Sequence, residues 1–288
     1  MMLPMVMAPL RRLRLTRRTS DPPPVEDSSS SNKGMEPTTA EPESFCPSLW
    51  DVLKTRHVLQ WKVVPGGMPA EIVDLIVDAA EYWPSSVVTM QGSTIIRNDR
   101  DRVILKTDPL CYSPKTLSTS SPTTVPHRTI HPCRKIIFSI SAHDQGWGGH
   151  GDGESIFNGS FTWFDTEIIP FTPFSDQRLE DTNVPERQHF GPDHPNLLPR
   201  EDKLQSNPIA NDETQHYTIT WHHLDNIQPD SDEAEEIKLS QGRGRATLDG
   251  SQVRGLEIGQ SIALWARARF GGWANHVDGA SIRVFWSV

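Results

Sequence analysis

The chain has 288 residues, of which 35% are hydrophobic and 24 are proline, so we expect a core diluted by long polar loops. Residues 1–20 hold five arginines and no acid, and removing these charges from the net −9 leaves −14 on the rest. An acidic body argues against nucleic acid as a partner. No apolar run approaches the ~20 residues that span a bilayer, so no membrane association is expected.

The three cysteines, Cys46, Cys111 and Cys133, are scattered and never form a C-x-x-C pair. This pattern argues against a disulfide framework or a zinc site and favours an intracellular, reducing compartment. The arginine-rich leader is compatible with nuclear import or with a mitochondrial presequence, although Pro4 and Pro9 weaken the helix that a presequence needs. We expect a cytoplasmic or nuclear protein, with mitochondrial import as the alternative.

The chain divides into a tail and one domain. Residues 1–46 are predicted to be a disordered tail, first basic and then acidic, because their proline and serine runs bury too little apolar surface to offset ordering entropy. Residues 47–288 are predicted to form a single domain. One short helix is expected over 69–81, ended by Pro84, with one apolar face formed by Ile72, Leu75, Ile76 and Ala79.

Beyond this helix, alternating apolar and polar residues predict β-strands. The candidate strands cover residues 93–96, 102–105, 136–141, 160–165, 217–221, 261–270 and 282–286. Three segments lack periodicity and are predicted to be long irregular loops, at residues 112–132, 171–213 and 225–250. The acidic run Asp230–Glu236 is expected to be part of a solvated loop.

Strands with one apolar face, separated by long excursions, predict a mainly β fold. The expected architecture is an antiparallel two-sheet β-sandwich with one short helix and a disordered N-terminal tail. In the strand 261–270, alternate residues from Ile262 to Phe270 are predicted to face inward. Trp265, Arg267 and Arg269 are then predicted to lie on the opposite, solvent face.

Two glycine-rich turns at strand ends each hold a tryptophan, in His143–Gly149 and in Trp265–Trp273. Trp147 and Trp273 could stack on a sugar, an arginine side chain or a methylated amine, with Asp144 and Asn275 giving direction. The alternative is structural, with Asp144 capping backbone N–H groups and the tryptophans sealing the strand ends.

Two further groups of side chains have alternative interpretations. Arg267 and Arg269 could pair with carboxylates on a neighbouring strand, which we favour, or could grip an anionic ligand. The cluster of His143, Asp144, His150 and Asp152 could bind a divalent metal, although it lacks the H-E-x-x-H spacing of zinc hydrolases. No nucleophile elbow or phosphate-binding loop is present, so no cofactor is expected.

The turn 143–149, the segment 158–164 and the ending 264–276 resemble a fungal protein family. The same segments also resemble the galactose-binding-like β-sandwiches, among them F-box-associated sugar-binding domains and plant phloem lectins. This resemblance implies a jelly-roll sandwich that binds its ligand at a loop rim. Residues 69–76 are also similar to the opening of an F-box helix, but Pro84 ends that helix early and further helices are not expected, so an F-box adaptor is not an expected partner.

The preferred hypothesis is therefore a non-catalytic, lectin-like module that recognises a glycan or a protein segment at a loop rim. The candidate ligand-binding residues are Asp144, Trp147, Arg267, Arg269, Trp273 and Asn275. The alternatives are a metal-dependent hydrolase that uses the cluster at 143–152 and a purely structural scaffold. Whether the two glycine–tryptophan turns meet is the geometric question that the sequence leaves open.

Overall fold

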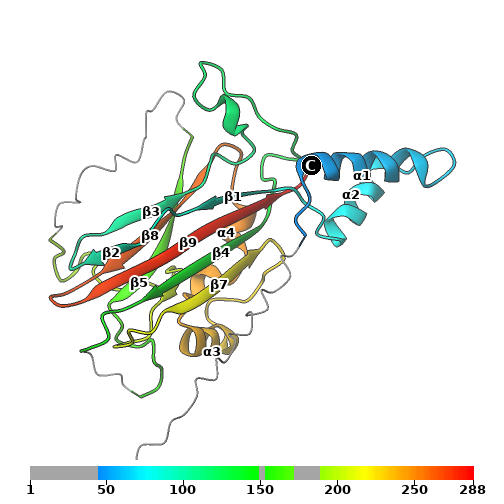
Figure 1. The fold of residues 1–288 in the computed structure, drawn as a ribbon. Helices are drawn as coiled ribbons and strands as arrows, with labels where there is room; N and C mark the ends of the chain where they lie inside the picture. Colours follow the sequence, from blue (N-terminus) through cyan, green and yellow to red (C-terminus); the bar gives the residue numbers. More distant parts are fainter. Residues whose placement is uncertain (1–44, 149–152, 172–188) are drawn as a thin grey trace, which may run out of the picture. The chain divides into compact units, whose positions relative to one another are not determined.

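The computed structural model describes residues 45–148, 153–171 and 189–288 (Figure 1). The tail predicted for residues 1–46 lies outside this part of the chain except for Phe45 and Cys46. The described strands form two antiparallel sheets, which confirms the mainly β fold and the two-sheet sandwich.

Sheet A has the strand order β1–β9–β4–β7, and β2 pairs with the first part of β9 while β1 pairs with its last part. Its strands are β1 (Ser85–Thr89), β2 (Thr94–Arg97), β4 (Cys133–His143), β7 (Gln215–His222) and β9 (Ala274–Trp286). Sheet B has the order β3–β8–β5–β6. Its strands are β3 (Arg102–Lys106), β5 (Thr162–Ile169), β6 (Gln205–Ser206) and β8 (Ser261–Ala268).

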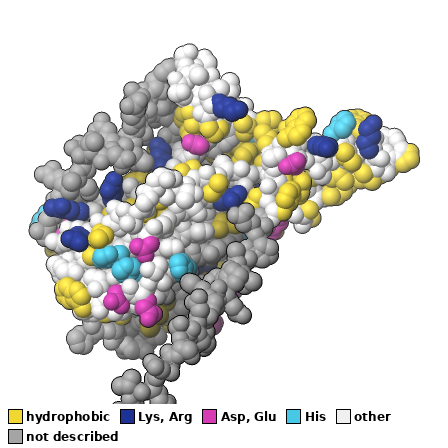
Figure 2. Space-filling view, viewed as in Figure 1, with side chains coloured by type: hydrophobic (Ala, Val, Ile, Leu, Met, Phe, Trp, Pro, Cys, Tyr) yellow, Lys and Arg dark blue, Asp and Glu magenta, His cyan; other side chains and the backbone are white. Residues whose placement is uncertain are grey.

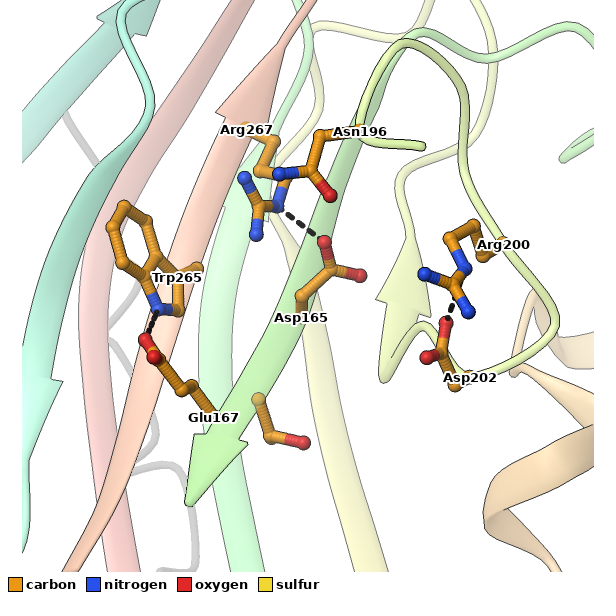
Figure 3. Close-up of a pocket in the computed structure, with 8 residues that line it drawn as sticks. Asp165, Glu167, Asn196, Arg200, Asp202, Trp265 and Arg267 are labelled. Carbon is orange, nitrogen blue, oxygen red and sulfur yellow. Dashed lines mark hydrogen bonds and ion pairs between the residues drawn. The ribbon is translucent and has the colours of Figure 1, made fainter. Parts of the chain in front are cut away.

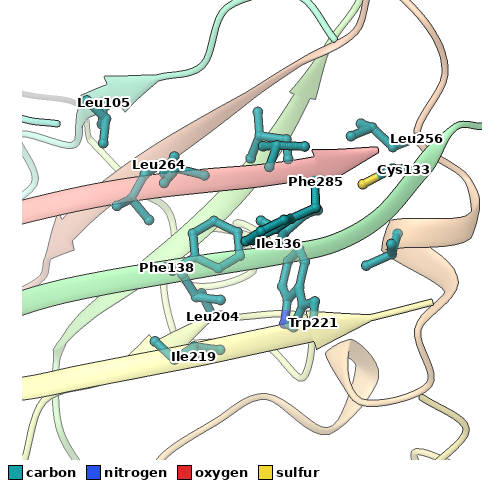
Figure 4. Close-up of a cluster of buried hydrophobic side chains, with 14 of the residues drawn as sticks. Leu105, Cys133, Ile136, Phe138, Leu204, Ile219, Trp221, Leu256, Leu264 and Phe285 are labelled. Atoms are coloured by element: carbon teal, nitrogen blue, oxygen red, sulfur yellow. The ribbon is translucent and has the colours of Figure 1, made fainter. Parts of the chain in front are cut away.

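The core lies between the two sheets and follows the predicted alternation. Phe138 and Ile282 of sheet A and Phe164 and Leu264 of sheet B are all fully buried. The Trp221 ring meets Phe138 edge-on, with 4.9 Å between ring centroids (Figure 4). Burying each such side chain contributes about 1.5–3 kcal/mol, so this layer supplies much of the stability.

The expectation of a single helix was wrong. The described residues contain α1 (Leu49–Lys62), α2 (Ala70–Ala79), α3 (Asp232–Gln241) and α4 (Ser251–Arg254), besides the short 3-10 helices η1 (Pro114–Thr116) and η2 (Arg245–Thr247). The helix α1 begins with a capping box, in which Ser48 and Asp51 satisfy each other's backbone N–H groups. Among the described helices, none is both long enough and apolar enough to cross a bilayer.

The acidic run Asp230–Glu236, expected in a solvated loop, instead contributes to the start of α3. The Ser231 side chain caps the helix by accepting a hydrogen bond from the Ala234 N–H at 3.2 Å. Acidic side chains in the first turn interact favourably with the helix dipole. Gly242 ends the helix with φ of +75°, a conformation that glycine adopts at little cost. Capping and charge placement here outweigh the missing apolar periodicity.

The predicted helix is present as α2, but its orientation is unexpected. Val73 and Val77 are the buried residues, at 1% and 2% exposure. The apolar face recognised in the sequence points away from the core, and Ile72, Leu75 and Ile76 are all exposed. The helix is therefore apolar both toward the core and toward solvent, and Figure 2 shows hydrophobic side chains gathered over α1 and α2.

Candidate functional site

The two glycine–tryptophan turns meet at one end of sheet A. β4 and β9 are neighbours, and the paired residues His143 and His276 stack with 4.6 Å between ring centroids. Beyond β4, the Gln145 side-chain oxygen accepts a hydrogen bond from the Ala274 N–H at 3.1 Å. The Trp147 indole lies directly on Gly272, where a Cβ would approach Cη2 to 2.6 Å. The two turns therefore form one continuous surface.

Within this surface, Asp144 is buried and its carboxylate is hydrogen-bonded to backbone groups of the protein. Its two oxygens accept hydrogen bonds from the N–H groups of Gly146 and Ala210, each at 2.8 Å. Burial raises the pKa of Asp144, and the backbone hydrogen bonds oppose this shift. The geometry matches the capping alternative, since the side chain joins the turn to the segment that precedes β7.

The other rim candidates differ in their exposure. Trp147 is 62% exposed, whereas Trp273 is 9% exposed and packs edge-on against Phe161. Asn275 is fully buried and donates to the carbonyls of Trp163 and Arg267 while accepting from the Asn207 amide. Of these tryptophans and polar groups, Trp147 offers the ligand-accessible surface.

Arg269 was predicted to face solvent, and this was wrong. Its guanidinium is fully buried and makes a two-pronged ion pair with Asp101. It also donates twice to the Asn196 carbonyl, at 2.8 and 2.6 Å, and lies 3.9 Å from the centroid of the Phe190 ring. The segment around residues 190–196 covers this end of sheet B, which is why the alternation of β8 misleads here.

Phe270 was predicted to face inward and instead is exposed. β8 ends at Ala268, and Phe270 has φ of +66°, so the chain has already left the extended conformation. Arg267 pairs with Asp165 of the neighbouring strand β5 and with Asp101. The Arg267–Asp165 pair is the favoured pairing of an arginine with a carboxylate on a neighbouring strand.

A groove on the outer face of sheet B brings together residues that the sequence interpretation did not combine. It encloses about 330 Å³ and is lined by residues of β5, of β8 and of the segment before β6 (Figure 3). The lining residues are Asp165, Thr166, Glu167, Asn196, Arg200, Asp202, Trp265 and Arg267.

Internal contacts hold the polar groups of the groove in place. The Trp265 indole N–H donates to Glu167 at 2.8 Å, and the Arg267 guanidinium lies 5.0 Å from the Trp265 ring centroid. Burial raises the pKa of Asp165, and the neighbouring Arg267 opposes this shift. Arg200 and Asp202 pair at 3.5 Å on the loop side (Figure 3). The groove therefore presents three carboxylates, two guanidinium groups and one indole, of which Asp165, Arg267 and Trp265 are held by internal contacts.

The alternation of residues along β8 by itself indicates part of this groove. Trp265 and Arg267 share one face of β8, and Asp165 is paired with Trp265 across the sheet. No local sequence pattern indicates that Asn196, Arg200 and Asp202 line the groove, because these residues lie in an irregular segment.

The proposed metal cluster is only partly within the described residues, since His150 and Asp152 lie outside them. The His143 Nδ1–H donates to the Asp144 carbonyl at 2.7 Å. The described residues contain no group of three or more histidine, cysteine or acidic side chains arranged to hold a metal ion.

The fold and the groove define a β-sandwich with a polar groove on the outer face of one sheet. Comparison of the chain with known protein families, with curated proteins and with solved structures finds no match.

Proposed function

We propose that the chain is a non-catalytic, lectin-like recognition module that binds a glycan in the groove of sheet B. The observation that carries this proposal is the combination of acceptors, donors and an indole on adjoining strands. Sugar hydroxyl groups both donate and accept hydrogen bonds, so they can donate to the carboxylates of Glu167 and Asp202 and accept from the Arg200 guanidinium and the Asn196 amide. The Trp265 indole supplies the apolar surface against which a sugar ring packs.

The charge of the groove favours a neutral ligand that carries many hydroxyl groups. The three carboxylates of Asp165, Glu167 and Asp202 are opposed by the guanidinium groups of Arg200 and Arg267. The carboxylate of Asp165 is already engaged by Arg267 and by the Trp163 indole N–H, which suits binding better than proton transfer. Side chains that are held before binding lose little entropy when the ligand arrives.

A glycan array probed with the full chain, followed by titration of the best binder, tests the proposal. Asp202→Ala and Trp265→Ala are each expected to weaken binding about tenfold or more. Glu213→Ala, an exposed acid away from the groove lining, is the matched control and should bind normally. Unchanged binding by Asp202→Ala and by a folded Trp265→Ala would contradict the proposal.

A second candidate is recognition of a protein segment at the rim formed by the two turns. The exposed Trp147 indole, seated on Gly272, favours this candidate. In a pull-down experiment, a rim ligand would be lost with Trp147→Ala and retained with Asp202→Ala. The opposite pattern would assign the ligand to the groove.

A further inference from the structure

The strand β5 is paired on one side along its whole length and on the other side only in part. β8 pairs with every residue of β5, whereas β6 pairs with Trp163 and Phe164 alone. On the β6 side, the Phe164 carbonyl accepts a hydrogen bond from the Leu204 N–H at 2.8 Å. Every second residue of a strand points its N–H and C=O groups to the same side, so those of Thr166 and Ile168 also face the side of β6. In the described part of the chain, no group pairs with the main chain of these two residues there.

The segment before β6 would cover this edge if it continued the pairing, but it turns away. The register between β5 and β6 would place Lys203 opposite Thr166 and Glu201 opposite Ile168. Instead, the carbonyls of Lys203 and Glu201 accept hydrogen bonds from N–H groups of residues 244–246, at 3.2 and 2.8 Å. Sheet B therefore lacks a strand beside the second half of β5.

The groove of about 330 Å³ lies at this unfilled position. Thr166 and Glu167 of β5 line one side of it, and Arg200 and Asp202 of the diverted segment line the other (Figure 3). A row of unpaired N–H and C=O groups along a strand edge is a template for another extended chain. Here the template is bounded by a second wall, so the position of the missing strand is a groove rather than an open edge.

We propose that an extended segment of a partner protein pairs with β5 in this groove and completes sheet B. The main chain of the segment exchanges hydrogen bonds with Thr166 and Ile168, in the manner of peptides that add a strand to an open sheet. This inference goes beyond the proposed glycan binding, because the segment is held by the main-chain edge of β5 and not by the Trp265 indole on the outer face of β8.

Glu167 lies between these two residues and favours a basic side chain in the segment. Its carboxylate accepts a hydrogen bond from the Trp265 indole N–H at 2.8 Å, and no lysine or arginine of the described residues forms an ion pair with it. Directly opposite residues of paired strands have Cβ atoms about 4.5–5.5 Å apart, so a lysine opposite Glu167 reaches its carboxylate. The residues on either side of that lysine lie opposite Thr166 and Ile168, and Ile168 is 38% exposed, which suits β-branched side chains. A second copy of β5 centred on Glu167 would instead place two like charges opposite each other.

Fluorescence anisotropy of a labelled peptide, titrated with the full chain, tests the proposal. In the probe, threonine and valine alternate around a central lysine that is flanked by valines. The wild type is expected to bind it saturably, and glutamate in place of the lysine is expected to weaken binding about tenfold or more. N-methylation of the two flanking valine amides removes the donors that face β5 and is expected to abolish binding, whereas N-methylation of the lysine amide, which faces away, should be tolerated. No saturable binding, or an equal effect of the two methylations, would overturn the proposal.

A charge exchange tests the contact with Glu167. Glu167→Lys is expected to lose the lysine peptide and to bind the glutamate peptide, and the exposed Glu213→Lys, outside the groove lining, is the matched control that should keep the preference of the wild type. An unchanged preference in a folded Glu167→Lys would contradict the assigned register. A wild-type dimer in sedimentation equilibrium that the peptide dissociates would identify a second copy as the occupant and overturn the proposal. Binding of a glycan without binding of the peptide contradicts this inference alone, and the reverse result contradicts the glycan proposal alone.

Discussion

Arg269 and Asp101 form an ion pair in which the two side chains are 0% and 1% exposed. Asp101 follows the turn between β2 and β3, and Arg269 follows β8, so the pair joins two segments far apart in the sequence. Arg269 extends the connection to the Asn196 carbonyl on the segment that borders the groove.

Removing either partner of this pair is expected to destabilise the fold strongly. Arg269→Ala leaves the Asp101 carboxylate buried without its main partner, which costs about 3–5 kcal/mol in the free energy of unfolding. Urea unfolding of the variant and the wild type measures the difference. Arg200→Ala is the control, because Arg200 is exposed, and a similar loss in both variants would contradict the assignment.

Gly272→Ala is expected to separate the two turns. Gly272 has φ of +95°, and an added Cβ would lie 2.6 Å from the Trp147 ring, so both the backbone and the stacked indole must shift. The strained backbone alone costs about 1–3 kcal/mol in the free energy of unfolding. Gly271→Ala, where an added Cβ meets nothing within 4 Å, should unfold like the wild type. Equal stability of the two variants would show that the turns do not depend on this contact.

The stacked histidines are expected to make the sandwich less stable in acid. Burial lowers the pKa of His276, and the neighbouring His143 and Arg97 lower it further, while Asp278 opposes them. The unfolded chain therefore binds this proton more readily than the folded chain. The contribution of His276 to stability is complete above the ordinary histidine pKa of about 6.5 and is lost as the pH falls from there through the lower folded value.

Thermal unfolding between about pH 7.5 and 5 measures this effect. His276→Gln should lose stability less steeply toward acid than the wild type, and the exposed His189→Gln should follow the wild type. If the stability of His276→Gln falls with decreasing pH as steeply as that of the wild type, the stacked histidine pair is not the cause of the acid sensitivity.

Thiol reagents are expected to distinguish the three cysteines. Burial raises the pKa of the Cys111 and Cys133 thiols to about 12, so almost no reactive thiolate forms at neutral pH. Cys46 is half-buried and should be the thiol that reacts in the folded protein. Titration with a chromogenic disulfide should count one thiol before unfolding and three afterwards. A higher count in the native protein would show that the core around Cys133 opens.

Much of the β-architecture could be predicted, because alternation is a local property of each strand. The run Ile136–Ser141 lies within β4, and residues 282–286 lie within β9, as predicted. The strand β1 was missed because Ser85 and Ser86 give it no apolar alternation. The helix α3 was missed because caps and charges define it rather than an apolar face.

The candidate site was less predictable than the fold. The sequence pointed to Asp144 and Asn275 as rim residues, yet both side chains are buried and hydrogen-bonded within the sandwich. The groove remained unrecognised because Asp165, Asn196 and Trp265 come from segments that only the sheet register and the covering loop bring together.

The sequence by itself determined that this chain forms strands with one apolar face and that glycine-rich turns follow two of these strands. These features follow from the two-residue period of a strand and from the backbone freedom of glycine, which need no distant partner. Only the tertiary structure decided that Trp147 is exposed, that Arg269 is buried and that the apolar face of α2 points outward. Exposure depends on which distant segment covers a face, and no pattern within the strand or helix itself records that.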